Sequence, residues 1–341
     1  MKIRLYIIYL LAVLLTACGD TTESKLQKFL LKGNLAAKEQ NLEQALYYFN
    51  ECVNLDPCFA EALNNIGTVY FKLDKLDQSL QYYAKAIECK PEFIDTYFNR
   101  ANTLYELKEY YSALKDLDRI ESVKEDTAVL HFTRGLVLSK LRDFQGSRRS
   151  FQRAIEIDRA NVEQWVNLAT VEYYLKNYSN AREALNTAMS IDADEAHIYN
   201  TLAMIDIEEH NLDEASVNVN KAISLSPRDA FFKNNRGYIY LMSNELDKAL
   251  EDINNSIGAD PENGWAYRNK GIYYLMTEDY ANAERLLKQA YEMDSFIDKI
   301  HFYLGMAYLQ NGKVGEACHE FDLSEEAGDE MLTAALIKIC K

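Results

Sequence analysis

The sequence predicts an all-α fold in which nine helix-turn-helix repeats of 34 residues are followed by a C-terminal capping helix. Two observations carry this prediction: small residues recur every 34 residues from residue 26 to residue 331, and all four prolines occupy one place in that period. A third observation is the apolar pattern of residues 329–341, which fits a helix that covers the end of a stack.

Small side chains mark fixed places in each repeat. When Leu26 is taken as position 1, position 8 is always Gly or Ala and position 20 is always Ala or Ser. These residues let two helices approach closely, while large residues at positions 4, 11 and 24 fill the space between them. The prolines at position 32 end the second helix of a repeat, because proline cannot continue one: Pro57, Pro91, Pro227 and Pro261.

The last residues of the chain have one apolar face at helical spacing. Its members are Met331, Leu332, Ala335, Leu336 and Ile339. A repeat cannot bury its outer face without a neighbour, so we expect this segment to cap the ninth repeat.

The 34-residue pattern resembles the tetratricopeptide repeat family over residues 26–331, which is almost the whole chain after the N-terminal segment. The resemblance implies a right-handed superhelical α-solenoid whose first helices line a concave groove. It also implies that the groove binds a protein or peptide partner.

The N-terminal segment reads as an export signal. Residues 1–17 begin with Lys2 and Arg4 and continue in an apolar run that is too short to span a bilayer. The end of this segment, LTAC, resembles a bacterial lipobox, which implies cleavage before Cys18 and acylation of that cysteine. Residues 18–25 would then be the lipidated cysteine and a short linker, and Gly19 resembles an outer-membrane address. The alternative is an ordinary secretory signal that leaves Cys18 as a free thiol.

The charge of the chain argues against two classes of partner. It has 53 acidic and 37 basic side chains and a formal net charge of −16. Such a surface repels nucleic acid and anionic lipid. We therefore expect no nucleic-acid partner and contact with a membrane through the lipid anchor only.

No catalytic motif is present in the sequence. It has no phosphate-binding glycine loop, no HExxH pair, no GxSxG elbow and no CxxC. We therefore expect neither an enzyme nor a metal or cofactor site. Charged residues at usually apolar positions should form structural pairs, namely Arg100 with Asp116 and Arg236 with Asp252; the alternative is a general acid–base pair.

In the family that the pattern resembles, position 6 faces the groove, and here it is often asparagine. An asparagine amide donates and accepts at once, so a ladder of them suits the backbone of an extended peptide. The predicted ladder is Asn65, Asn99, Asn167, Asn235 and Asn269. The alternative is that asparagine is simply common at this position.

The later repeats carry large apolar residues at groove positions where the first repeats are polar. We expect these residues to form the main partner-binding surface: Phe231, Tyr238, Met242, Trp265, Ile272, Met276 and Met306. The alternative is that the curvature of the solenoid hides them.

The cysteines after the lipobox suggest one cross-link at the C-terminal end. If the helices around Gly328 pack antiparallel, Cys318 and Cys340 lie level with each other, and an oxidising periplasm would bridge them. Cys58 and Cys89 are a second candidate pair, and Cys52 should be a packed thiol.

Together these features predict a lipid-anchored scaffold at the periplasmic face of an outer membrane, acting in envelope assembly or secretion. The alternative function is an accessory subunit that presents substrates to a separate envelope enzyme.

Overall fold

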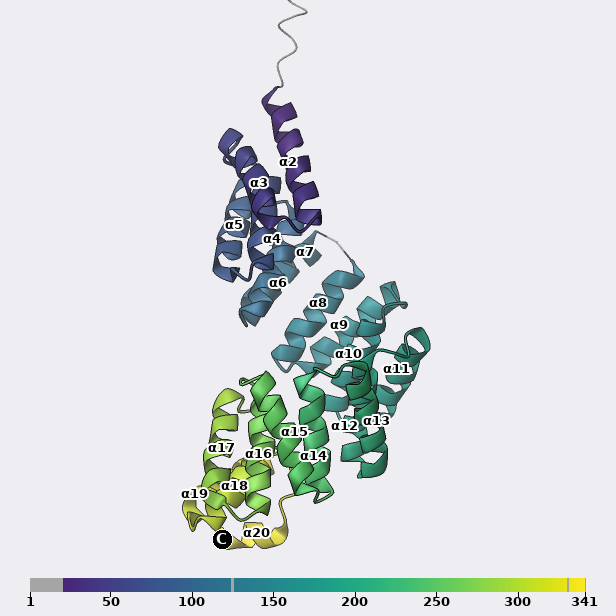
Figure 1. Ribbon diagram of the computed structural model, residues 1–341, viewed down its shortest axis with the longest axis vertical. Coiled ribbons are helices and arrows are strands. Elements are labelled where there is room, and N and C mark those ends of the chain that lie inside the picture. Colours follow the sequence, from purple (N-terminus) through teal and green to yellow (C-terminus); the bar gives the residue numbers. More distant parts are fainter. Residues whose placement is uncertain (1–20, 124–125, 330, 341) are drawn as a thin grey trace, which may run out of the picture. The chain divides into compact units, whose positions relative to one another are not determined.

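The computed structural model describes residues 21–123, 126–329 and 331–340 (Figure 1). Contacts divide the chain into two compact units, residues 1–159 and residues 160–341. The described residues contain nineteen helices, α2 to α20, and no strand. The predicted fold class, an all-α solenoid of helix-turn-helix repeats, is confirmed.

The first unit is a stack of four helix hairpins. Each hairpin packs on the next, and the first helices of neighbouring hairpins also touch. The helices are α2 (Thr22–Lys38), α3 (Leu42–Leu55), α4 (Ala60–Lys72), α5 (Leu76–Cys89), α6 (Ile94–Glu106), α7 (Tyr110–Ser122), α8 (Ala128–Lys140) and α9 (Phe144–Ile157).

The second unit contains five hairpins and a short terminal helix. Its helices are α10 (Val162–Tyr174), α11 (Tyr178–Ile191), α12 (Ala196–Glu208), α13 (Leu212–Leu225), α14 (Ala230–Met242), α15 (Leu246–Ala259), α16 (Gly264–Met276), α17 (Tyr280–Met293), α18 (Ile300–Gln310), α19 (Val314–Glu326) and α20 (Ala334–Ile339).

The small residue at position 8 makes room for an aromatic ring. In the second hairpin, Gly67 of α4 lies against the buried ring of Tyr83 in α5, and a Cβ on Gly67 would stand 2.6 Å from that ring. Gly33 meets the ring of Phe49 in the same way in the first hairpin. The close approach of the two helices therefore depends on a large ring at position 24 and a small residue opposite it.

Every hairpin turns through a residue in the left-handed region at position 15. The non-glycine residues there have φ between 57° and 64°, from Gln40 in the first hairpin to Glu278 in the eighth. In the first turn, Gln40 N–H donates to the Ala37 carbonyl and Asn41 N–H donates to the Ala36 carbonyl. This is the Schellman arrangement, which satisfies the last carbonyls of the first helix before the chain reverses.

The C-terminal cap is smaller than the sequence predicts. Helix α20 has six residues and none of them is buried. Leu336 packs against the core of the second unit, whereas Met331, Ala335 and Ile339 of the predicted apolar face are exposed. The segment is held instead by a disulfide between Cys318 of α19 and Cys340, whose Cα atoms are 5.3 Å apart.

The first unit contains a second disulfide and a buried thiol. Cys58 is bonded to Cys89, which joins the loop before α4 to the last residue of α5 and so links the two ends of the second hairpin. Cys52 is a buried free cysteine, and burial raises the pKa of its thiol to about 11. Its Sγ lies 3.5 Å from the Leu26 carbonyl oxygen, so it fills space between α2 and α3.

Candidate functional site

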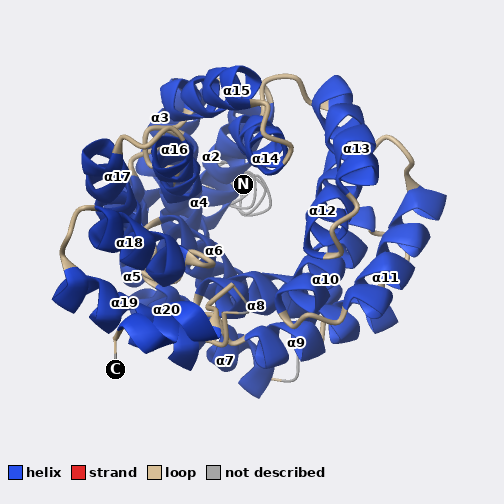
Figure 2. Cartoon of the chain, turned by 90° about the horizontal axis from the view of Figure 1, so that it is seen from below, coloured by secondary structure: helices blue, strands red, loops and turns tan. Residues whose placement is uncertain are grey.

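The concave side of the second unit is formed by the first helix of each hairpin. Helices α10, α12, α14, α16 and α18 contact one another in succession. Figure 2 shows α10, α12, α14 and α16 on the inner side of their partners. The sequence-predicted apolar surface lies on three of these helices, α14, α16 and α18.

The structure divides that predicted surface into exposed and buried members. Phe231, Met242 and Met276 are exposed, and they stand at the two ends of α14 and at the end of α16. Tyr238 and Ile272 belong to the core cluster of the unit and are 9% and 3% exposed, although Ile272 also lines the hollow described below. Their contact with a partner stays a prediction. The stacking of neighbouring first helices covers the middle of each helix and leaves its ends open.

Trp265 is half-buried and belongs partly to the same core. The guanidinium carbon of Arg268 lies 4.9 Å from the centre of the Trp265 ring and 4.7 Å from that of Tyr238. Arg268 is itself buried, and its Nε and Nη2 donate to Asn269 Oδ1. Replacing Trp265 would therefore disturb packing as well as any surface that it offers.

An apolar hollow of about 240 Å³ opens between α16 and α18. Met276 and Met306 stand among its walls, and one polar residue, Gln310, borders it together with two tyrosines. A cavity of about 150 Å³ is enough to hold benzene, so this hollow has room for one large apolar side chain. Its lining residues are Ile272, Leu275, Met276, Tyr280, Phe302, Tyr303, Met306 and Gln310.

The predicted asparagine ladder connects hairpins to each other. The side-chain amide of Asn235 donates to Asn200 Oδ1 at 2.9 Å, and that of Asn269 donates to Asn234 Oδ1 at 2.9 Å. Asn269 is also buried and accepts from Arg268, so its amide is already occupied within the chain, and its contact with a peptide stays a prediction.

The first unit repeats this pattern. Asn65 donates to Asn34 Oδ1 at 2.9 Å and Asn99 donates to Asn64 Oδ1 at 3.0 Å. Asn167 bonds within its own helix, to the Glu163 carbonyl. Contact of Asn65, Asn99, Asn167 and Asn235 with a peptide stays a prediction, but most of these amides already have a partner between hairpins.

One ion pair reaches across the concave side of the second unit. Lys299 precedes α18 and donates from Nζ to both carboxylate oxygens of Glu208, at the end of α12, at 3.2 Å. Burial alone would lower the pKa of Lys299, but Asp298, Tyr238 and Glu208 together outweigh it and raise that pKa. The pair links the sixth hairpin to the ninth.

No sequence pattern signals this bridge. Lys299 has φ of 57°, and among the described residues it is the non-glycine residue with positive φ that lies outside the hairpin turns. Because of this turn, α18 begins at Ile300, two residues later in the repeat than the first helices of the preceding seven hairpins. No glycine, asparagine or proline marks the deviation.

Both predicted ion pairs are confirmed as structural contacts. Asp116 accepts from Arg100 Nε at 2.7 Å and from Nη2 at 2.6 Å. Asp252 accepts from Arg236 Nε at 2.6 Å and from Nη2 at 2.9 Å. Each pair joins the two helices of one hairpin, and each carboxylate is buried.

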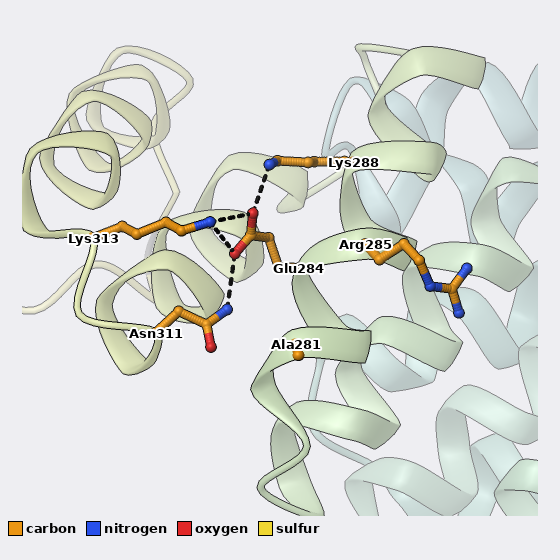
Figure 3. Close-up of a pocket in the computed structure, with 6 residues that line it drawn as sticks. All are labelled: Ala281, Glu284, Arg285, Lys288, Asn311 and Lys313. Carbon is orange, nitrogen blue, oxygen red and sulfur yellow. Dashed lines mark hydrogen bonds and ion pairs between the residues drawn. The ribbon is translucent and has the colours of Figure 1, made fainter.

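A second, polar hollow of about 450 Å³ lies where the eighth and ninth hairpins meet. Figure 3 shows Lys288, Lys313 and Asn311 converging on Glu284, while Arg285 points away. Burial alone would raise the pKa of Glu284, but the hydrogen bonds from these three residues outweigh it and lower that pKa to about 2. The two lysines neutralise the charge of Glu284. We therefore interpret this cluster as a structural contact that holds the eighth and ninth hairpins together.

The described part of the chain contains no group of three or more His, Cys, Asp or Glu residues placed to hold a metal ion. Within the same residues, every helix is too short or too polar to cross a membrane. Cys18 and the predicted signal segment 1–17 lie outside the described residues.

Comparison with known proteins agrees with this geometry. Models of the tetratricopeptide repeat match residues 60–93, 132–196 and 268–329. The chain contains tetratricopeptide repeats. Repeats of this family form scaffolds that typically mediate protein–protein interaction. No curated protein sequence matches the chain.

Solved structures of low sequence identity share the tetratricopeptide fold. The Cut9-Hcn1 hetero-tetramer of the APC/C matches 89% of this chain at 18% identity with a TM-score of 0.60, and the chain spans 59% of the matched protein. PilF of Pseudomonas aeruginosa matches 62% of this chain at 17% identity with a TM-score of 0.55, over 96% of its own length. An IFIT1 monomeric mutant with Gppp-AAAA matches 81% of this chain at 16% identity with a TM-score of 0.56, over 70% of its length.

Proposed function

We propose that this tetratricopeptide repeat protein is a lipid-anchored scaffold that holds a protein or peptide partner in the concave groove of its second unit. The observation that carries the proposal is the apolar hollow between α16 and α18. Soluble proteins rarely leave such surface open without use, and methionine walls adapt to varied side chains. Met276 and Met306 would therefore receive one large apolar side chain of the partner.

The neighbouring exposed residues extend this surface along the unit. Met242 stands at the end of α14, and Met276 holds the corresponding place on α16. A partner segment that follows the groove would meet one methionine per hairpin. This spacing favours an extended or helical peptide over a small molecule, because a small molecule would fill the hollow alone.

The location that we propose is the periplasmic face of an outer membrane, in envelope assembly or secretion. It is supported by the lipobox-like run that ends at Cys18 and by Gly19 after it. Only three residues separate Cys18 from the start of α2 at Thr22. The first hairpin would therefore stay close to the lipid.

Affinity capture from detergent-solubilised envelopes tests the groove. The baits are the wild-type chain, Met276→Glu and the control Met293→Glu. These two methionines are the last residues of α16 and α17 and are 39% and 41% exposed, but only Met276 lines the hollow. The proposal expects a partner that the wild-type and Met293→Glu baits retain and Met276→Glu loses. Equal capture by all three baits would contradict it.

A further inference from the structure

Helix α2 exposes a repeat position that every later hairpin of its unit buries. At position 10, Val69, Thr103 and Val137 are buried, and two of them pack with residues from the second helix of the preceding hairpin. In the first hairpin, by contrast, Leu35 at this position is 52% exposed. The first end of the stack is therefore open.

The open face combines leucine with lysine. We call it the α2 face and define it by Lys28, Leu31, Lys32 and Leu35, which are three or four residues apart and so neighbours on one side of the helix. All four are exposed, and Leu31 is 60% exposed. A repeat end that faces only water is normally polar, so two exposed leucines between lysines point to a surface that is partly apolar and partly anionic.

More lysines stand beside this face. Lys25 and Lys38, both exposed, lie near its two ends. Residues 21–40 contain these four lysines and two acids, Glu23 and Glu39, and so carry a net charge of +2. An amphipathic helix with lysines beside exposed leucines is the kind that lies in the interface of a lipid bilayer.

The net negative charge of the chain is concentrated in the second unit. Residues 160–341 contain 31 of the 53 acids and 15 of the 37 bases, which is a net charge of −16. Residues 18–159, which remain in the first unit after the proposed cleavage, hold 22 acids and 20 bases and carry a net charge of only −2. The net charge of the whole chain therefore does not oppose contact between the α2 face and anionic lipid.

We propose that the α2 face lies on the membrane surface, with Leu31 and Leu35 in the lipid interface and the lysines on anionic headgroups. The proposal rests on the proposed acylation of Cys18, which is four residues before Thr22 and so at most about 14 Å away along an extended chain. The anchor supplies most of the attachment, and the α2 face sets the orientation of the first unit on the lipid.

The charge of the face argues against a second copy of the chain as its occupant. A symmetric dimer through the α2 face would bring Lys28 and Lys32 of one copy close to the same lysines of the other. Like charges that approach in this way are destabilising, whereas an anionic bilayer attracts every lysine at once. An acidic protein partner is the remaining competitor, and the experiment below separates it from lipid.

Site-specific photo-crosslinking in membranes tests the proposal. A benzophenone amino acid replaces Leu31 or Leu35 in the full-length, exported chain, and a matched control replaces Tyr111, which is exposed on α7 of the same unit. Mass spectrometry of the irradiated protein distinguishes a lipid adduct from a protein adduct. We expect lipid adducts at positions 31 and 35, at least five times as abundant as at position 111. Protein adducts at position 31, or equal lipid labelling at all three positions, would overturn the proposal.

A second arm separates this proposal from the acylation of Cys18. Residues 19–341 carry an N-terminal hexahistidine tag and are tethered through nickel-chelating lipid to vesicles of phosphatidylethanolamine and phosphatidylglycerol. Lipid adducts at position 31 should form there, and their yield should fall at least threefold on phosphatidylcholine vesicles or at high salt. If lipid adducts form on the tethered chain but Cys18 of the exported full-length chain is not acylated, only the proposed anchor is refuted. Their absence on the tethered chain would refute the membrane contact even if Cys18 is acylated.

Discussion

Replacing Asp252 with alanine should destabilise the second unit by about 3 kcal/mol. The carboxylate accepts from Arg236 Nε at 2.6 Å and from Nη2 at 2.9 Å, and it is 5% exposed. Removing one partner of a buried ion pair costs about 3–5 kcal/mol because the other charge stays behind without compensation. About a quarter of the Arg236 side chain reaches solvent and Asn220 still accepts from Nη1, so the lower end applies.

The exposed pair between Lys248 and Glu245 provides the matched control. Its side chains are 61% and 42% exposed and belong to the same hairpin as Asp252. Exposed ion pairs contribute at most about 1 kcal/mol, so Glu245→Ala should change the free energy of unfolding by less than that. The two variants differ in the burial of the carboxylate and in the number of hydrogen bonds that it accepts, two for Asp252 and one for Glu245.

Tryptophan fluorescence during urea denaturation measures this difference. Both tryptophans of the chain, Trp165 and Trp265, lie in the second unit, so the signal reports the unit that contains Asp252. A loss of less than about 1 kcal/mol for Asp252→Ala would refute the argument that burial makes this pair structurally important. Replacing Arg236 and Asp252 together by leucine and methionine should restore much of the stability, since no charge is then left unpaired.

Three further predictions concern other parts of the chain. Cys18→Ser should move the protein from the membrane to the soluble periplasmic fraction; a variant that still pellets and still incorporates labelled fatty acid would show that the anchor lies elsewhere. Peptide mapping of exported protein without reductant should recover Cys318 joined to Cys340, and alkylation of both thiols would contradict the bridge. The pKa of Glu284 is lowered to about 2, so its charge stabilises the fold above about pH 4.5 and this contribution disappears as the pH falls toward 2. The difference in unfolding free energy between wild type and Glu284→Gln should accordingly be largest at neutral pH, and a difference that grows as the pH falls would contradict the assignment.

The hairpin geometry could be predicted from the sequence because the same packing contact recurs in successive repeats. Gly67 opposite Tyr83 and Gly33 opposite Phe49 are two instances of one small residue facing one ring. Nine repetitions make such a rule visible without a structure. The pairing of Arg100 with Asp116 followed from the same register, because position 7 and position 23 face each other within a hairpin.

The candidate site was less predictable because it depends on how neighbouring hairpins stack. Tyr238 and Ile272 occupy groove positions in the repeat, but close stacking of the first helices covers them. Asn269 is the residue type expected in a peptide ladder. Its amide nitrogen, however, donates to Asn234 in the neighbouring hairpin, and its amide oxygen accepts from Arg268. Neither outcome follows from the spacing within one repeat.

The ion pair between Lys299 and Glu208 could not be predicted from the repeat pattern at all. The two residues are 91 positions apart, and the seventh and eighth hairpins lie between them in the chain. Their meeting depends on the curvature of the second unit and on the left-handed backbone at Lys299, and a 34-residue pattern specifies neither. The open face of α2, by contrast, lies within a single helix, in which Leu31 and Leu35 are 60% and 52% exposed.

Hydrogen–deuterium exchange with a captured partner tests the central claim most directly, since it locates binding without altering the chain. The second unit contains the apolar hollow between α16 and α18, and we expect a partner to slow exchange in the last turns of these two helices. Helices α11 and α13, on the outer side of the same unit, should exchange at the same rate with and without the partner. Protection that appears on the outer helices, or only in the first unit, while α16 and α18 remain unchanged would contradict the account.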